Sequence, residues 1–146
     1  MVLLLAFWFQ LLLPEWPWLA RLQADPTYKL VTGLIFCLYL TLMWLLFLFR
    51  EIEVFIVAKQ LFRWHEPAGF MGPLLFYLHA DRLGHGYQLL LGLVFFANIL
   101  LGLAYPLIHG LKSQRWHHVW LVLHIALAAV LPLLIGFHIY IVYAFK

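Results

Sequence analysis

Residues 115–141 read RWHHVWLVLHIALAAVLPLLIGFHIYI, and they indicate the fold class of the whole chain. From residue 119 onward this stretch contains no aspartate, glutamate, lysine or arginine. A helix of about 20 residues crosses a hydrocarbon core of about 30 Å, and this run is long enough to do so. Two histidines, His124 and His138, lie inside it with thirteen residues between them. The stretch therefore predicts a membrane-spanning helix that carries two imidazoles.

Two further segments are long and apolar enough to span a bilayer, so that the spans expected are 28–49, 85–108 and 118–145. Backbone groups in lipid must be paired within their own segment, and we therefore expect all three to be helices. The link between the last two spans, residues 110–116, is short and polar. These two spans are thus predicted to form an antiparallel hairpin.

Composition supports a membrane protein, because 66% of the 146 residues are hydrophobic and only 10% are charged. That leaves too few charges to coat a soluble core, and lipid is the expected surroundings. The net charge of +3 comes from scattered residues, so no nucleic-acid partner is expected. A single cysteine, Cys37, excludes iron–sulfur clusters and zinc fingers, which need several thiolates. We predict one all-α domain over residues 1–146, an integral membrane bundle of three to four transmembrane helices.

Two other parts of the chain are expected to touch the membrane. Residues 2–20 are apolar but interrupted by two prolines, and they predict a fourth, kinked helix or a half-inserted interfacial one. Residues 50–64 mix charged and apolar positions and are expected to continue the first span along or beyond the interface, as the first part of an interfacial stretch over 50–84. HEPAGFMGPL, residues 65–74, should break this stretch because prolines and glycines punctuate it.

The two histidines of the last span are placed to serve cofactors near the two membrane surfaces. At about 100° and 1.5 Å per residue, His124 and His138 lie within roughly 40° of one face and about 21 Å apart. If the hairpin folds at about residue 113, residue 88 lies opposite His138, less than one turn from His85. His85 and His138 are then expected to ligate one haem iron from opposite sides, since neutral imidazole is a normal axial ligand.

A second haem is expected at His124. The same folding places Gly102 opposite it, with His109 as the nearest histidine, about two turns away along the helix. The second iron would take His124 with His109, or with a ligand from a neighbouring chain. The remaining histidines lie near predicted helix ends, where interfacial placement is expected: His65, His79, His117 and His118. Three basic residues near the haem ends are candidates to pair with propionates: Arg82, Lys112 and Arg115.

Other chemistries have no motif here. There is no HExxH zinc motif, no glycine-rich nucleotide loop, and the only serine, Ser113, lies in a predicted loop. An electron-transfer subunit of an oxidoreductase complex is therefore favoured over an enzyme acting alone. Two alternatives stay open: a structural or pigment-holding subunit without haem, in which single histidines ligate chlorophyll, and a transporter with histidines along a pore.

Two stretches of this sequence resemble a known family. HGYQLLLGLVFFANILLGL, residues 85–103, is similar to the ligand-bearing helix of bacterial membrane cytochrome b subunits. Residues 115–141 resemble the later helix of the formate dehydrogenase and nickel–iron hydrogenase cytochrome b subunits. That helix carries a histidine, thirteen intervening residues and His-Ile-Tyr, here His124 and then residues 138–140.

The resemblance implies a four-helix subunit of the bacterial inner (cytoplasmic) membrane that holds two b haems. Such a subunit passes electrons between a peripheral redox subunit and quinone or a partner cytochrome, within a complex of membrane or peripheral redox subunits. One or two haem b groups are therefore expected, with the ligands His85, His138, His124 and His109. This sequence departs from the family in one respect: no histidine occurs from Met1 to Trp64, whereas the family draws its four ligands from three helices.

Overall fold

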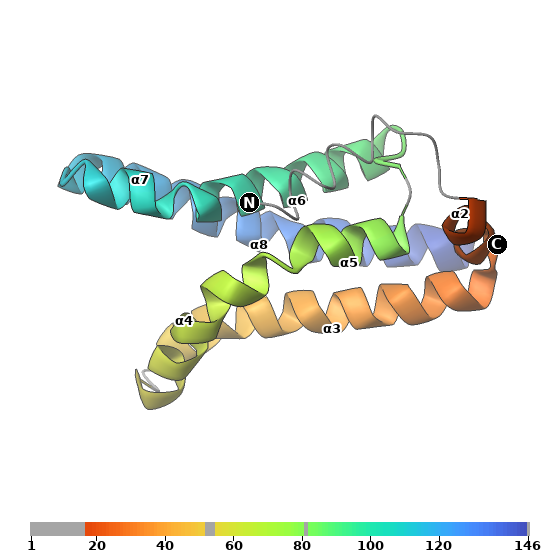
Figure 1. Cartoon of the computed structure of the whole chain (residues 1–146), viewed down its shortest axis with the longest axis horizontal. Coiled ribbons are helices and arrows are strands. Elements are labelled where there is room, and N and C mark those ends of the chain that lie inside the picture. Colours follow the sequence, from red (N-terminus) through yellow and green to blue (C-terminus); the bar gives the residue numbers. More distant parts are fainter. Residues whose placement is uncertain (1–16, 52–54, 81, 146) are drawn as a thin grey trace. The chain divides into compact units, whose positions relative to one another are not determined.

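In the computed structural model, the residues described are 17–51, 55–80 and 82–145, and all regular structure among them is helical (Figure 1). The chain divides into two compact units, and the boundary along the sequence falls between Arg82 and Leu83. The helices are α2 (Pro17–Ala24), α3 (Pro26–Glu51), α4 (Phe55–Gly69), α5 (Gly72–His79), α6 (Tyr87–Leu103), α7 (Tyr105–Gly110) and α8 (Gln114–Ala144).

Three helical stretches are long and apolar enough to cross a membrane: Pro26–Leu45, Tyr87–Gly110 and Gln114–Ala144. They confirm the all-α class and the three spans expected from the sequence. Large apolar side chains point outward along them, and Leu133 in the middle of α8 is 73% exposed. Such exposure suits a lipid surrounding, because lipid tails solvate apolar side chains. The chain is an integral membrane protein.

In the first unit, a capped turn starts the spanning helix α3. Asp25 precedes the helix, and its carboxylate Oδ1 accepts a hydrogen bond of 2.8 Å from the backbone N–H of Tyr28. Pro26 follows at the first helical position, where its missing N–H costs nothing. The preceding helix, α2, overlaps only the last residues, 17–20, of the helix predicted over residues 2–20. The rest of that predicted helix lies outside the described residues.

Helices α4 and α5 pack against α3 (Figure 1), and the expected interfacial position of residues 50–84 stays a prediction. The Tyr39 hydroxyl of α3 donates a hydrogen bond of 3.2 Å to the backbone carbonyl of Ala68 in α4. Further along, the ring of Phe36 meets the buried ring of Phe76 edge-on, with centroids 6.3 Å apart. The apolar sequence of α5, GPLLFYLH, explains this packing, because contact with α3 buries part of it.

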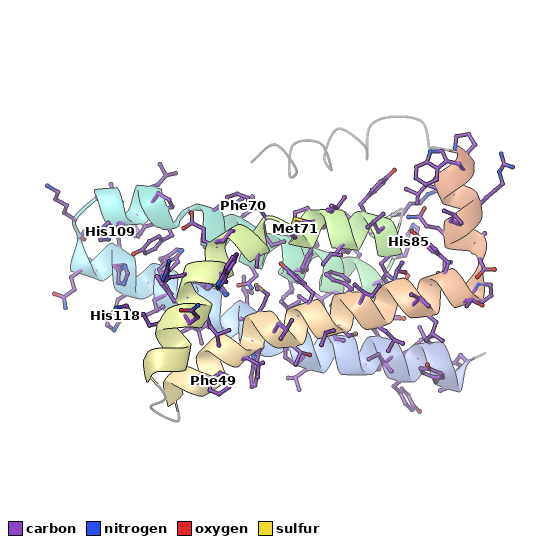
Figure 2. The ribbon with its side chains drawn as sticks, turned by 60° about the horizontal axis from the view of Figure 1, so that its bottom comes forward. Phe49, Phe70, Met71, His85, His109 and His118 are labelled. Atoms are coloured by element: carbon purple, nitrogen blue, oxygen red, sulfur yellow. The ribbon has the colours of Figure 1, made fainter. Side chains whose placement is uncertain are left out.

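The junction between α4 and α5 falls inside the predicted break. Phe70 and Met71 form it (Figure 2), after α4 ends at Gly69 and before Pro73 in the first turn of α5. Proline suits that first turn because its N–H would have no helical partner there. The amide of Gln23 in α2, a buried side chain, donates a hydrogen bond of 2.7 Å to the Tyr77 carbonyl and ties α2 to α5.

The second unit is the predicted hairpin. Helix α6 continues through α7 to a short turn, where Lys112 takes a positive φ of 51°, and α8 then returns along α6 (Figure 1). Phe95, Phe96 and Leu131 are its buried apolar side chains among the described residues. The hairpin matters for function because it determines which side chains of α6 and α7 meet the histidines of α8.

Candidate functional site

His124 faces a glycine across the hairpin, as the predicted register placed it. A Cβ added at Gly102 would lie 3.6 Å from Cε1 of His124. The imidazole also hydrogen-bonds with the backbone of Asn98, one helical turn before that glycine. A backbone carbonyl can only accept, so one ring N–H donates to Asn98 and the other ring nitrogen carries the lone pair. Gly102 thus lets the imidazole come close to the α6 backbone.

Trp120 of α8 contacts both α6 and the ring of His124. Its indole N–H donates a hydrogen bond of 2.6 Å to the carbonyl of Leu101 on α6. Its ring lies nearly parallel to the ring of His124, with centroids 5.7 Å apart and an interplanar angle of 8°. A tryptophan one turn before His124 therefore fixes both the hairpin register and one face of the imidazole.

An aromatic stack extends from His124 toward the hairpin turn. We define it as the rings of His109, Tyr105, Trp120 and His124. Tyr105 lies 5.0 Å from Trp120 and 5.6 Å from His109, between ring centroids. His117 adds a further ring, 5.5 Å from Trp120. His109 and His124 are thus joined through two intervening rings, and a haem between them would have to displace Tyr105 and Trp120.

His138, one predicted ligand of the first haem, lies on α8 with Nδ1 buried. Its ring centroid is 6.1 Å from that of Tyr87, and Tyr87 also meets Phe137 edge-on at 5.2 Å. This is the register predicted from folding the hairpin at about residue 113. The aromatic side chain of α6 that reaches His138 is Tyr87, the first residue of that helix.

His85, the predicted partner of His138, lies in the turn before α6, whereas the sequence predicted that it would open the helix. The glycines on each side of it take positive φ values, 71° at Gly84 and 57° at Gly86, so the chain turns there and the helix begins at Tyr87. The His85 side chain is exposed, as is that of His109. Within this unit, His85 lies at one end of the hairpin and His109 at the other (Figure 2).

Sequence reasoning missed a half-buried histidine contact in the first unit. Nδ1 of His79, the last residue of α5, lies 3.2 Å from the hydroxyl Oγ1 of Thr32 in α3. That hydroxyl also lies 2.8 Å from the Tyr28 carbonyl, and a hydroxyl that donates to this carbonyl accepts from the imidazole. Nδ1 of His79 then carries the proton and Nε2 the lone pair. The separation of His65 and His79 along the chain equals that of His124 and His138, and this spacing was the signal that could have singled His79 out.

The histidines differ in how well they suit a haem iron. A ligating imidazole donates its other ring N–H to a protein acceptor, which fixes its tautomer and orientation. His124 meets this condition through Asn98, and His79 meets it through Thr32. Among the described residues no group of three or more His, Cys, Asp and Glu side chains could hold a bare metal ion. Haem needs only axial ligands from the protein, because the porphyrin supplies the other four nitrogens.

No family model, curated protein or solved structure matches this chain. The resemblance to bacterial cytochrome b subunits stays a prediction.

Proposed function

We propose that this chain is a membrane b-type cytochrome subunit that carries electrons within a larger redox complex of the bacterial inner membrane. The observation that supports it most is the placement of His124 and His138 in α8. Both imidazoles are half-buried with buried Nδ1 atoms, and both belong to a helix long enough to span a bilayer. Ionisable side chains inside membrane helices are costly and mark functional sites.

The separation of the two imidazoles suits two haems stacked across the membrane. Fourteen residues of helix span about 21 Å, so each imidazole lies toward a different bilayer surface. A haem b, when bound, supplies one-electron oxidation and reduction at its iron. The residues of this chain would bind and orient it: Asn98 and Trp120 hold the ring of His124 in one orientation, and Tyr87 contacts the ring of His138.

The wider setting of this proposal rests on the resemblance alone. It comprises membrane or peripheral redox subunits as partners and quinone as electron donor or acceptor. The apolar composition of these 146 residues suits a membrane-embedded carrier of electrons. We therefore propose an electron-transfer subunit.

A reduced-minus-oxidised visible spectrum of the purified chain, with haem per chain measured as the pyridine haemochrome, tests this function. We expect sharp b-type bands in the wild type and loss of haem in His138→Ala and in His124→Ala. His118→Ala is the matched control, because this exposed histidine lies on the same helix near the turn (Figure 2). A wild-type chain that contains no haem after expression with a haem precursor would refute the cytochrome.

One observation favours a second candidate, a structural subunit of a membrane complex without haem. In the aromatic stack, His109 packs on Tyr105 and His124 packs on Trp120. Such ring contacts are what a histidine with a purely structural role would make. In that case His124→Ala would lower the thermal stability of the chain, and no haem or pigment would copurify with the wild type.

A further inference from the structure

The charged residues of this chain are divided unevenly between its two units. The first unit, Met1–Arg82, balances six basic residues with six acidic ones. The second unit, Leu83–Lys146, contains no aspartate or glutamate and three basic residues: Lys112, Arg115 and Lys146. The whole net charge of +3 therefore belongs to the hairpin, and no acidic side chain of that unit neutralises it.

Two of these three basic residues lie at the hairpin turn. Lys112 takes the positive φ of the turn, and Arg115 follows in the first turn of α8, which contains no acidic residue. Both side chains are exposed, and neither forms a hydrogen bond or an ion pair within the described part of the hairpin. These two cations are therefore available to an anion from outside the unit.

The length of α8 places this turn at the depth of the lipid head groups. The helix has 31 residues, and at about 1.5 Å per residue it spans about 46 Å. A bilayer measures about 40–45 Å with its head groups and about 30 Å across its hydrocarbon core. Trp116 supports this depth, because it is exposed and tryptophan is enriched at the membrane interface. The charges of the turn therefore lie where lipid phosphates lie.

Exposed apolar side chains lie next to the two cations. Leu111, the residue before Lys112, is 58% exposed, and Leu107, one turn deeper in α7, is 75% exposed. A phospholipid has the same two-part character, because its anionic phosphate is joined to apolar chains. The turn thus offers cations to the head group and leucines to the chains, whereas a free phosphate ion would use the cations alone.

We propose that Lys112 and Arg115 form a binding site for the phosphate of an anionic phospholipid at the hairpin turn. Arginine binds phosphate through two parallel hydrogen bonds, and lysine adds a compact positive charge. Both residues were also candidates to pair with haem propionates. The lipid is favoured because the rings of Tyr105 and Trp120 occupy the hairpin between its turn and His124. The site does not depend on the proposed cytochrome function.

Lipid titration of the purified full chain in a neutral detergent, followed by native mass spectrometry, tests the site. The probes are phosphatidylglycerol, phosphatidylcholine, whose head group has no net charge, and inorganic phosphate. We expect the wild type to bind its first phosphatidylglycerol more tightly than its first phosphatidylcholine. A basic residue near an anionic lipid surface contributes about fivefold in affinity, so Lys112→Gln and Arg115→Gln should each lose about fivefold, and the double variant about 30-fold.

Three further variants keep the test decisive if a glutamine variant fails to fold. The exchange of Lys112→Arg with Arg115→Lys preserves both charges and should keep the wild-type preference for phosphatidylglycerol. Gln114→Lys adds a third charge at an exposed position between them and should raise the affinity about fivefold. Lys29→Gln is the matched control, because it removes one exposed charge from α3 in the other unit and should leave the first binding event unchanged.

Four outcomes would overturn the lipid site. The first is a wild type that binds both lipids equally, or a double variant whose preference is unchanged. The second is an equal loss of affinity in Lys29→Gln, which would reduce the effect to net charge. The third is displacement of phosphatidylglycerol by inorganic phosphate, which would make the ligand the free anion. The fourth is loss of haem from the double variant with an unchanged lipid preference, which would return Lys112 and Arg115 to the propionates.

Discussion

The closest approach between a glycine and a histidine gives the sharpest stability prediction. An alanine Cβ at Gly33 would lie 3.0 Å from Cε1 of His79, well inside the contact distance of about 3.5–4.0 Å between carbons. The ring would have to retreat by about 0.5 Å to restore that distance. Its 3.2 Å hydrogen bond to Thr32 would then exceed hydrogen-bonding range.

The magnitude follows from three opposing effects. Overpacking costs about 1–3 kcal/mol. The lost hydrogen bond costs about 0.5–1.5 kcal/mol. Alanine gains about 1 kcal/mol over glycine in a helix interior. We therefore expect Gly33→Ala to lower the free energy of unfolding by about 0.5–3.5 kcal/mol.

Gly102→Ala is the matched control, because it places the same methyl group opposite another histidine at an ordinary distance. Its Cβ would lie 3.6 Å from Cε1 of His124. No retreat is needed there, so the helix gain of up to about 1 kcal/mol remains. At roughly 2–4 °C per kcal/mol, the two variants should differ by about 3–18 °C in Tm.

Thermal unfolding in detergent micelles, followed by far-UV circular dichroism at one heating rate, measures this difference. The double variant of Gly33→Ala with His79→Ala removes the ring that the methyl group strikes. In the His79→Ala background we expect Gly33→Ala to be neutral or stabilising. If Gly33→Ala destabilises equally in both backgrounds, or if Gly102→Ala is as damaging, the packing argument for His79 is wrong.

Two other predictions concern the elements that carry the site. Trp120→Phe keeps an aromatic ring but loses the hydrogen bond to α6, and we expect a cost of about 0.5–1.5 kcal/mol by the same unfolding assay; the exposed Trp116→Phe should be near neutral. Asp25→Ala removes the cap of α3 and should cost about 0.5–2 kcal/mol, whereas Asp25→Asn, which can still accept from the backbone, should retain most of the stability. An equal loss in Asp25→Asn would contradict the capping role.

Much of the second unit could be predicted because it depends on local rules. Length and apolarity predicted the two spans, and the short polar link predicted their antiparallel pairing. The register then followed from helix rise alone, which is why Gly102 lies at His124 as expected. The direction in which each side chain points around its helix was harder to predict. The sequence did not indicate that Tyr105 and Trp120 would fill the space between His109 and His124.

The first unit was less predictable because its arrangement depends on distant contacts. The sequence did not indicate that the short apolar helix α5 would pack on α3. The hydrogen bond between His79 and Thr32 joins residues 47 positions apart, and no local sequence pattern predicts it. The glycines around His85 were visible in the sequence, but their positive φ values, which end the turn and start α6 at Tyr87, were not.

The order of amino acids alone is enough to establish an integral membrane protein, its helical class, and the placement of His124 and His138 in one long span. Those conclusions need only the lack of charge over a length set by bilayer thickness and the need to pair backbone groups within each segment. The packing of the helices is needed to tell which histidines are held in place and which are exposed at helix ends. The environment of each histidine depends on residues of other helices, such as Thr32 for His79 and Asn98 for His124. The sequence around each histidine does not predict these contacts.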